Sequence, residues 1–362
     1  MKILYLNYEF PPLGGGASPV SYEIAKGYVK RGHEVDVVTM SYRDLPEFER
    51  VDGINIYRVK SLRSKKEICH PWEQLTYIIS AKKFLSDRLK QVAYAVIHAH
   101  FIIPTGAIAL WLKKRFNIPY VITAHGSDVL GYNKRFALLY PFLKRPWENI
   151  IKNAKCVTAP SDFLIRKIRE ITDQGTFETI ANGLDLTTFQ PMKKEDKILV
   201  VARLFPNKGV QDILDALKGM NLGKWSVDIV GDGPHRDVLE SMAREYGLAG
   251  KVRFRGWMDN ASNEMKELYG KAHIFISASY FESFGLTVLE AVSAGCYPLI
   301  SDIDGHRFII DDDRYFFRKK NIEDLREKLK TLITKGTDGF SVNIERFDWD
   351  NVMHNYISLL ES

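Results

Sequence analysis

Two glutamates, Glu282 and Glu290, frame the segment ESFGLTVLE of this 362-residue chain. An apolar, β-rich run precedes the segment and a helical pattern follows it, which predicts a helix N-terminus between the glutamates. That N-terminus is predicted to comprise Ser283, Phe284, Gly285 and Leu286. Main-chain N–H groups at such an end lack helical partners and favour anions, while carboxylates accept hydrogen bonds from hydroxyl groups. We therefore expect a long ligand held at two hydroxylated ends, with a phosphate on the amides between them.

A glycosidase acid/base pair is the alternative chemistry for two carboxylates. Such pairs are about 5–9.5 Å apart. If residues 282–290 formed one continuous helix, the glutamates would be separated by roughly 12 Å along the axis and about 80° around it. This spacing favours a ligand that spans the two side chains over glycoside hydrolysis.

Two cations, Arg203 and Lys208, follow an earlier predicted strand in the stretch RLFPNKG. Arginine offers a planar fork of donors and lysine a compact charge, a combination that suits a diphosphate around a tight turn. The stretch VGDGP (230–234) ends the next strand, and Gly231 there permits a ligand to approach the backbone closely. A surface-charge pair and a plain turn are the alternative interpretations of these two features.

Three consecutive glycines, residues 14–16, follow the first predicted strand in PPLGGGA. A dinucleotide site requires the spaced pattern G-x-G-x-x-G and an acidic residue after the second strand. Here Pro19 stands where the third glycine belongs, and the second strand ends in VVTM. A flexible glycine loop that faces the cleft and can contact phosphate or acceptor is the better interpretation.

Histidines end two predicted strands, in HAH (98–100) and in ITAHGSD (122–128), which contains His125. A packed or surface histidine is the ordinary interpretation, and the spacing of these residues does not define a metal site. The acidic stretches at 302–304 and 311–313 are interpreted as turns. The sequence therefore predicts no metal ligand and no cofactor.

Strand and helix patterns alternate along both halves of the chain, which predicts parallel sheets covered by helices. We expect an α/β protein of two Rossmann-like domains facing each other across a cleft, with ligands at the carboxyl ends of the strands. The N-terminal domain is predicted to comprise residues 1–187, completed by a C-terminal helix at 348–362, and the C-terminal domain residues 188–347. Ser18 and Pro19 are predicted as the N-cap and first position of the first helix.

Charge is unevenly distributed between the two halves. Residues 1–190 carry 27 Lys and Arg against 18 Asp and Glu, whereas residues 191–362 carry 24 against 27. The basic half indicates either a solvated surface or an anionic partner, but no aromatic-basic motif supports nucleic acid binding. The three distant cysteines fit buried thiols in a reducing compartment, and no apolar run reaches the length of a membrane span. We expect a cytoplasmic protein.

A cationic stretch in the basic half leads into a helical pattern rich in apolar residues. Its five cations are Arg58, Lys60, Arg63, Lys65 and Lys66. The apolar residues that follow are Trp72, Leu75, Tyr77, Ile78 and Ile79. One interpretation is that these residues pack the helix on its sheet. The other is peripheral, salt-reversible binding to an anionic membrane on its inner face, with the acceptor entering beside residues 14–16.

Together these stretches resemble the retaining glycosyltransferases of GT-B architecture, specifically glycosyltransferase family 4. ESFGLTVLE is similar to the E-x7-E motif of that family, and ARLFPNKG to its G-R-x-x-x-x-K-G element. GGGASPVSYEIAKGYVKRGHEVDVVT, TAHGSD, ANGLDLTTFQP and VGDGP also fall in the order of the family, and FDWDNVMHNYISLL resembles its terminal helix. The segment 301–317 departs from the family because it lacks a glycine-rich, Glu-bearing loop.

The resemblance implies transfer of a hexose-type sugar from a UDP- or GDP-type donor, with retention of anomeric configuration. The acceptor would be a glycan, a lipid-linked molecule or a small molecule. A nucleotide-sugar epimerase on the same architecture is the alternative. The resemblance makes residues 1–187 the acceptor-side domain and residues 188–347 the donor-binding domain.

The resemblance also implies roles for individual residues. Arg203 and Lys208 would bind the donor diphosphate, Glu290 the ribose and Glu282 the donor sugar. The amides of Ser283–Leu286 would hold the distal phosphate and sugar, and Gly231 would line the donor site. From the other domain, Gly15 and Gly16 would approach the phosphates and His125 the sugar. The catalytic set would thus comprise His125, Glu282, Arg203 and Lys208, with no obligatory metal.

Overall fold

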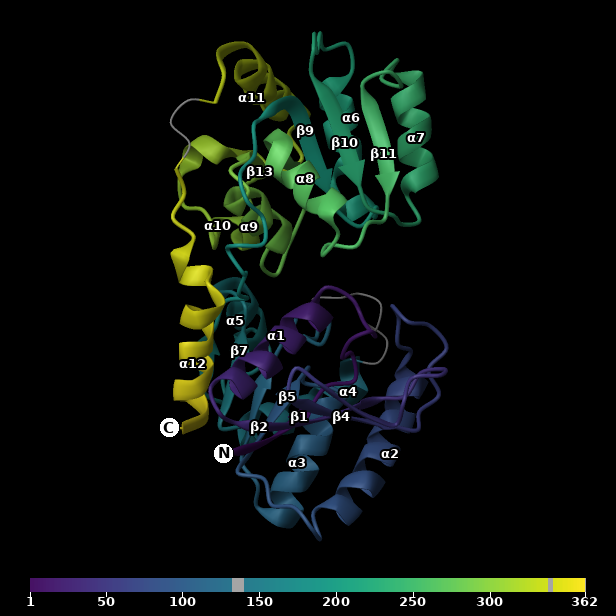
Figure 1. The fold of residues 1–362 in the computed structure, drawn as a ribbon, viewed down its shortest axis with the longest axis vertical. Coiled ribbons are helices and arrows are strands. Elements are labelled where there is room, and N and C mark those ends of the chain that lie inside the picture. The colour runs from purple at the N-terminus through teal and green to yellow at the C-terminus, as the bar shows by residue number, and fades with distance from the viewer. Residues whose placement is uncertain (132–139, 338–340, 362) are drawn as a thin grey trace. The chain divides into compact units, whose positions relative to one another are not determined.

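The chain folds into two compact units in the computed structural model (Figure 1). The residues that the structure describes are 1–131, 140–337 and 341–361. The first unit comprises Met1–Gly183 together with Trp349–Ser362, and the second comprises Leu184–Asp348. Each unit contains a sheet of mainly parallel strands with helices packed on it, so the predicted α/β class with two Rossmann-like domains is confirmed. None of the described helices has the length and apolar character needed to cross a bilayer.

The first unit contains an eight-stranded sheet. Its strands are β1 (Lys2–Leu6), β2 (Glu34–Met40), β3 (Phe48–Val51), β4 (Ile54–Val59), β5 (Val96–His100), β6 (Tyr120–Thr123), β7 (Cys156–Ala159) and β8 (Phe177–Thr179). They lie in the order β3-β4-β2-β1-β5-β6-β7-β8, and among these described strands only β3 and β4 pair antiparallel. The order reverses between β1 and β5, where ligands of open α/β sheets bind at the carboxyl ends of the strands.

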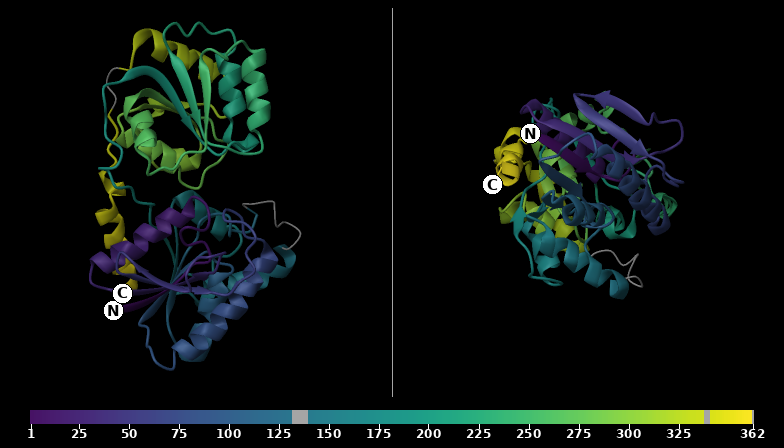
Figure 2. Two further views of the ribbon diagram at one scale, coloured as in Figure 1. Left: turned by 45° about the vertical axis from the view of Figure 1, so that its right-hand side comes forward. Right: turned by 90° about the horizontal axis from the view of Figure 1, so that it is seen from below.

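Helices cover both faces of this sheet (Figure 2). They are α1 (Ala17–Lys30), α2 (Pro71–Arg88), α3 (Thr105–Phe116), α4 (Tyr140–Asn153), α5 (Asp162–Arg169) and α12 (Trp349–Glu361). Because successive strand residues point to opposite faces, neighbours in β1 contact different helices. Leu4 and Leu6 join the core formed with α2, α3 and α4, whereas the hydroxyl of Tyr5 donates to the Ser21 carbonyl of α1 at 2.6 Å. α12 lies beside α1, although the two are far apart in sequence.

Two local features of this unit differ from the prediction. α1 begins at Ala17 with Gly16 at the N-cap position, and Ser18 is a buried residue of the first turn and does not cap the helix. The hairpin β3–β4 was missed, although its turn residues Asp52 and Gly53 have φ of 50° and 81°. A two-residue Asp-Gly turn with positive φ is a strong signal of a hairpin.

The second unit contains a six-stranded parallel sheet in the order β11-β10-β9-β12-β13-β14. Its strands are β9 (Glu195–Val201), β10 (Ser226–Val230), β11 (Val252–Gly256), β12 (Ala272–Ser277), β13 (Tyr297–Ser301) and β14 (Phe316–Phe317). Its helices are α6 (Val210–Leu217), α7 (Arg236–Glu245), α8 (Asn263–Lys271), α9 (Leu286–Ser293), α10 (Asp304–Arg307) and α11 (Ile322–Lys335). Here the strand order reverses between β9 and β12.

The helices of the second unit form from their own apolar patterns. In α6, Val210, Ile213, Leu214 and Leu217 recur at helical spacing and are all buried. They share a core with α7, α11 and alternate residues of the strands. α8 covers the opposite face, where Tyr269 stacks on Phe275 of β12 with ring centroids 6.1 Å apart. Two packed faces hold the strands rigidly, so the loops at their ends have fixed starting points.

Candidate active site

The second unit brings three loops together at one edge of its sheet. The loops follow β9, β10 and β12, which are neighbouring parallel strands. Carboxyl ends of parallel strands lie at the same edge, and the reversal between β9 and β12 makes this edge a favoured ligand position. These loops carry most of the predicted donor-site residues, namely Arg203, Lys208, Gly231 and the stretch from Glu282 to Leu286.

Lys208 and Glu282 form a largely buried ion pair across two of these loops. The ammonium of Lys208 donates to Oε1 of Glu282 at 2.5 Å, and the Ser279 hydroxyl donates to the same oxygen at 2.8 Å. Burial opposes ionisation of Glu282, but the adjacent Lys208 outweighs it and holds the pKa of this carboxyl below its usual value. A lysine has three donors and a carboxylate two oxygens. Both groups therefore retain hydrogen-bonding capacity for a ligand.

Arg203 is exposed on the loop that follows β9. In the described parts of the chain, no carboxylate pairs with its guanidinium, which lies 5.6 Å from the ring centroid of Phe205. The main chain beside it is fixed, because the N–H of Leu204 donates to the carbonyl of Asp232 at 2.9 Å. An unpaired guanidinium on an anchored loop is available to an anionic ligand.

Close packing within the second unit by itself requires glycine at position 231. Its φ is 131°, and a Cβ added there would lie 1.9 Å from the carbonyl oxygen of Ala202. The loops after β9 and β10 therefore touch backbone to backbone at this point, and any side chain would force them apart. The contact of Gly231 with a donor stays a prediction.

The segment 282–290 is not the continuous helix that the spacing argument assumed. α9 begins at Leu286, and Gly285 before it has a φ of 109°, so Glu282 lies in the preceding loop. The rise of roughly 12 Å between the glutamates therefore does not apply. The predicted helix N-terminus is nevertheless present at Leu286. The N–H of Val288 donates to the carbonyl of Gly285 at 2.9 Å, as expected for the first turn.

Phe284 anchors this loop through its side chain. The ring is buried and packs against Phe308 and Phe347, with ring centroids 6.0 Å and 5.6 Å away. Only the main chain of Phe284 is therefore left to face a ligand. Gly305 and His306, which directly follow the stretch 302–304 that was interpreted as a turn, support the same loop. A Cβ on Gly305 would lie 2.4 Å from the Glu282 carbonyl, and His306 is buried beside it.

Glu290 is buried in the first turns of α9 and bound by two donors. The Tyr269 hydroxyl donates to Oε2 and the Asn260 amide to Oε1, both at 2.7 Å. Burial raises the pKa of Glu290 to about 7, although both hydrogen bonds favour the ionised form. In its ionised form, this fixed carboxylate is a suitable acceptor for hydroxyl groups. Tyr269 and Asn260 were missed because they lie 21 and 30 residues away in sequence.

The first unit carries the remaining predicted residues at the carboxyl edge of its own sheet. Gly15 and Gly16 follow β1, and His125 follows β6. A Cβ on Gly15 or Gly16 would meet no atom within 4 Å. The fold of this unit therefore does not itself require glycine at these two positions.

His125 belongs to a chain of imidazoles that starts inside the sheet. Its Nε2 lies 2.9 Å from Nδ1 of His100, and His98 bonds to Tyr28 and Thr123 at 3.0 Å and 2.8 Å. Burial lowers the pKa of His125 and of His98 to about 3 and that of His100 well below its usual value. At neutral pH these rings are therefore uncharged, and His125 can serve as a hydrogen-bonding group but not as a cation.

The positions of the ring protons in these histidines follow from one buried nitrogen of His100. Nε2 of His100 is buried and has no partner among the described residues. An orphaned N–H is rarer in protein interiors than an orphaned acceptor, which favours a proton on Nδ1 of His100, donated to His125. The loop of His125 is itself fixed by Asp128, whose carboxylate accepts the N–H groups of Ile102, His125 and Gly126 at 2.7, 3.0 and 3.0 Å. Asp128 lies within the quoted stretch ITAHGSD, but the sequence did not reveal this role.

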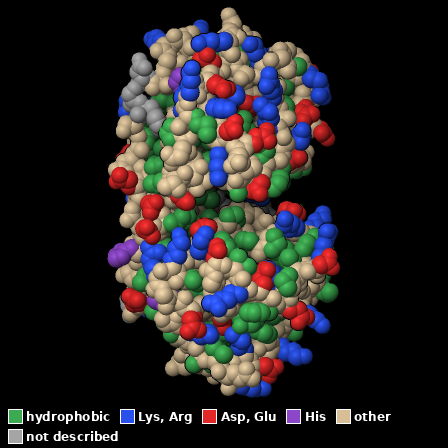
Figure 3. Space-filling view, in the orientation of Figure 1, with side chains coloured by type: hydrophobic (Ala, Val, Ile, Leu, Met, Phe, Trp, Pro, Cys, Tyr) green, Lys and Arg blue, Asp and Glu red, His purple; other side chains and the backbone are tan. Residues whose placement is uncertain are grey.

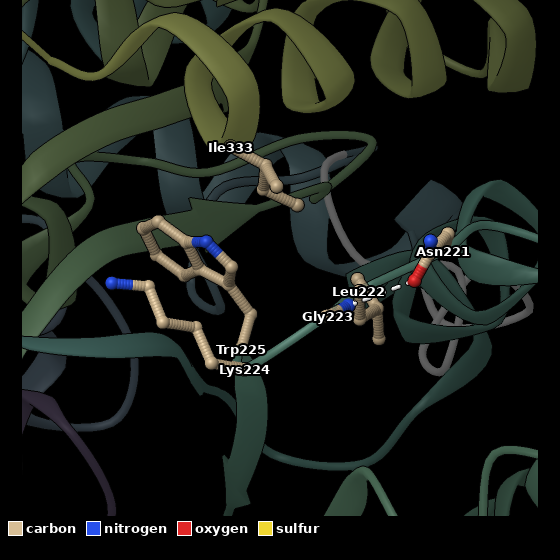
Figure 4. Close-up of a pocket in the computed structure, with 6 residues that line it drawn as sticks. All are labelled: Asn221, Leu222, Gly223, Lys224, Trp225 and Ile333. Atoms are coloured by element: carbon tan, nitrogen blue, oxygen red, sulfur yellow. Dashed lines mark hydrogen bonds between the residues drawn. The ribbon is translucent and has the colours of Figure 1, made fainter.

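Neither metal-ligating groups nor a cavity places the candidate site elsewhere in the described part of the second unit. Among the described residues, no group of His, Cys, Asp and Glu is arranged to hold a metal ion. A shallow hollow of the second unit is lined by Asn221, Leu222, Gly223, Lys224, Trp225 and Ile333 (Figure 4). It directly precedes β10, at the edge where the strands begin, so we assign it no part in the site.

Two family descriptions match adjacent parts of the chain. Glycosyltransferase Family 4 matches residues 14–188, and Glycosyl transferases group 1 matches residues 188–343. The chain belongs to glycosyltransferase family 4. Glycosyl transfer is therefore its class of activity, and the comparisons give no support to the epimerase alternative.

The similarity to relatives and to solved structures covers nearly the whole length of this glycosyltransferase. It is 28% identical to an uncharacterized glycosyltransferase of Methanocaldococcus jannaschii, over 99% of this chain and 97% of that protein. It is 25% identical to the alpha-monoglucosyldiacylglycerol synthase of Acholeplasma laidlawii, over 89% of this chain and 86% of that protein. The structure of Anabaena HepE in complex with UDP and glucose matches with a TM-score of 0.78 at 18% identity, covering 100% and 99% of the two chains. This likeness shows the fold, the two-domain GT-B architecture.

Proposed function

We propose that this glycosyltransferase moves a hexose-type sugar from a nucleoside-diphosphate donor to a lipid-linked acceptor, with retention of anomeric configuration. One observation carries the donor part of the proposal. The loops after two adjacent strands, β9 and β12, place the Lys208 ammonium against the Glu282 carboxylate beside the N-terminus of α9. Cation, hydroxyl acceptor and main-chain donors thus lie together, as a sugar diphosphate requires.

The donor would lie along this edge of the second unit. Arg203 and the remaining donors of Lys208 would bind the diphosphate, and the amides of Ser283–Leu286 would contact its distal phosphate. Glu282 would accept sugar hydroxyls on Oε2, because Oε1 already accepts from Lys208 and Ser279. Glu290 would accept the ribose hydroxyls. Gly231 would let the donor approach the backbone.

The first unit would contribute Gly15 and Gly16 next to the phosphates and His125 next to the sugar. Small residues that their own fold does not need are consistent with close approach to a ligand. The neutral imidazole of His125 would hydrogen-bond the sugar without adding charge.

Stabilisation of the leaving diphosphate is the proposed source of catalysis. As the bond between the anomeric carbon and the phosphate oxygen breaks, negative charge would develop on the diphosphate, next to which Arg203, Lys208 and the α9 amides would lie. The acceptor hydroxyl would attack from the same face and give its proton to the departing phosphate oxygen. The new bond then has the configuration of the old one. These charges replace a metal ion in the proposal.

The HepE structure contains UDP and glucose, which supports a UDP-type donor, although a GDP-type donor fits the same residues. The Acholeplasma relative is named for a glucosylated diacylglycerol, which supports a lipid acceptor. We place the enzyme in the cytoplasm, at the inner face of a membrane. Glycans and small molecules are the competing acceptors.

Donor binding can be tested without knowledge of the acceptor. UDP- and GDP-sugars are titrated calorimetrically into the protein and into the variant Arg203→Ala, with Arg253→Ala as the matched control. Arg253 is an exposed arginine of β11 in the same unit. We expect one nucleotide class to bind, a loss of roughly tenfold or more in Arg203→Ala and no change in the control. Equal affinity in both variants would contradict the donor assignment.

Acceptor class and stereochemistry require turnover. The protein is incubated with the radiolabelled donor and either a lipid extract or soluble glycans. Label in the organic phase supports the lipid acceptor, and label confined to the aqueous products contradicts it. The coupling constant of the anomeric proton in the product then reports retention or inversion.

A further inference from the structure

One face of α2 in the first unit is apolar and exposed. Trp72, Leu75 and Ile79 are 54%, 57% and 63% exposed. At about 100° per residue, these three side chains fall within an arc of about 60° on the helix. The buried residues Tyr77 and Ala81 lie on the opposite side. The helix thus packs on its sheet through one stripe and presents a second apolar stripe to solvent.

The loop before α2 extends this apolar face. Leu62 is 63% exposed and Ile68 38% exposed. The N–H of Leu62 donates to the Thr76 hydroxyl of α2 at 3.1 Å, which places Leu62 beside the helix. The buried carboxylate of Glu73 accepts from the N–H and the hydroxyl of Ser64 at 2.9 Å and 2.6 Å. The loop is therefore fixed along the first turns of the helix.

Lysines surround the exposed apolar residues. Lys60, Lys65, Lys66 and Lys83 are exposed, whereas Glu67 is the one exposed carboxylate among the described residues 60–83. Two of the five predicted cations do not belong to this surface, because Arg58 and Arg63 are buried. Arg63 instead donates to the carbonyls of Tyr8, Lys65 and Lys66, and so holds the lysine-bearing loop in place.

We propose that this surface, which we call the α2 patch, binds an anionic lipid bilayer. The α2 patch is defined as Lys60, Leu62, Lys65, Lys66, Ile68, Trp72, Leu75, Ile79 and Lys83. Exposed apolar side chains flanked by lysines match the apolar boundary and negative surface of such a bilayer. Figure 3 shows hydrophobic and basic side chains interspersed over α2. The charges of this surface give no comparable reason to expect a protein partner.

The α2 patch is joined to a loop of the candidate site. The N–H of Gly14 donates to the carbonyl of Lys66 at 2.9 Å, and Gly15 and Gly16 follow directly. Membrane contact would therefore hold the glycine loop near the lipid headgroups. This last step rests on the proposed lipid acceptor, whereas bilayer binding by itself does not.

Vesicle sedimentation without any nucleotide sugar tests the bilayer binding alone. The protein is mixed with vesicles of phosphatidylcholine, with or without phosphatidylglycerol, at low and high salt. We expect pelleting only with phosphatidylglycerol, and release at high salt. Reversal of two lysines in Lys65→Glu/Lys66→Glu should weaken the partition coefficient about thirtyfold or more. Trp72→Ser/Leu75→Ser/Ile79→Ser should weaken it at least roughly tenfold.

Matched controls separate the α2 patch from general effects of charge and apolar exposure. Lys330→Glu/Lys335→Glu reverses two exposed lysines of α11, and Trp257→Ser removes a 73% exposed tryptophan of the second unit. Both controls should bind like the parent protein, and thermal unfolding should be unchanged in all variants. Failure to pellet with anionic vesicles would overturn the proposal, as would equal binding by parent and patch variants. A concentration-dependent dimer abolished by the serine variant would assign the surface to a second copy instead.

Discussion

Glu290 links the proposed donor site to a measurable dependence on pH. Burial raises its pKa from an ordinary value of 4.5 to about 7. A group with this pKa is ionised in about a tenth of molecules at pH 6 and in about nine tenths at pH 8. If ribose hydroxyls bind only the carboxylate, affinity scales with the ionised fraction and is about tenfold higher at pH 8 than at pH 6.

The variant Glu290→Gln removes this titration while keeping the shape of the side chain. Its affinity for the nucleotide sugar should be independent of pH. At pH 8 it should bind roughly tenfold more weakly than the parent, because a neutral hydrogen bond replaces charge-assisted ones. The same variant should be more stable than the parent without ligand. A carboxyl whose folded pKa is raised loses stability as pH rises from about 4.5 through about 7, by up to roughly 3 kcal/mol for this shift.

Calorimetric titration with an intact nucleotide sugar is the suitable assay. Its diphosphate is esterified at both ends and lacks the ionisation near pH 6 of a terminal phosphate, so the ligand does not titrate in this range. Glu264→Gln is the control, since Glu264 is an exposed acid in the first turn of α8. A parent affinity that stays constant between pH 6 and pH 8 would refute the assignment. A slope that persists in Glu290→Gln would assign the titration to another group.

Three further predictions concern the cations of the donor site, the buried histidines and a requirement for metal. Arg203→Ala/Lys208→Ala should bind nucleotide sugar at least about a hundredfold more weakly in calorimetry, since each charge-assisted contact contributes about 1.5–3 kcal/mol. In denaturant titration this double variant should also be about 3–5 kcal/mol less stable than Arg203→Ala alone, because Glu282 loses its buried partner. Equal stability of the two variants would show that the ion pair between Lys208 and Glu282 contributes nothing to stability. His98 and His100 stay neutral when buried, so in the Glu290→Gln background, which lacks the opposite trend of Glu290, their contribution to stability should be complete above about pH 6.5 and fall by up to about 1.4 kcal/mol per histidine per pH unit below it. Melting temperatures measured between pH 7.5 and pH 5 test this prediction. A His98→Gln/His100→Gln variant whose melting temperature falls equally steeply as the pH is lowered would contradict it. Sugar transfer should survive EDTA, and activity that is lost on chelation and restored by a divalent cation would show that a metal is required.

Much of the fold could be predicted from the sequence because its signals are local. Alternation of strand and helix patterns indicates parallel sheets wherever it occurs, so the α/β class follows without tertiary contacts. The start of α9 near Leu286 is likewise encoded by the residues around it. Where a local signal was misinterpreted, as at Ser18, the error is confined to one turn of helix. The pair Asp52-Gly53 shows that a hairpin signal was available and was missed.

The candidate site depends on contacts between distant parts of the chain. Lys208 and Glu282 are 74 residues apart, and they meet because β9 and β12 are neighbours in the sheet. The pKa of Glu290 is set by burial and by Tyr269 and Asn260, which no spacing in the sequence relates to it. Strand order is decided by the packing of the whole sheet. The motif could therefore be recognised in the sequence, whereas the ion pair and the pKa values of its residues could not.

The α2 patch shows the same division within a single helix. The sequence determined that Trp72, Leu75 and Ile79 share one face, because helical periodicity is fixed by backbone geometry. It could not determine which face packs, since Tyr77, Ala81 and Leu85 form a second apolar stripe. Only the sheet resolved this, by burying the stripe that contains Tyr77 and leaving Trp72 in solvent. Periodicity depends on neighbouring residues along the chain, whereas burial depends on a surface that distant residues build.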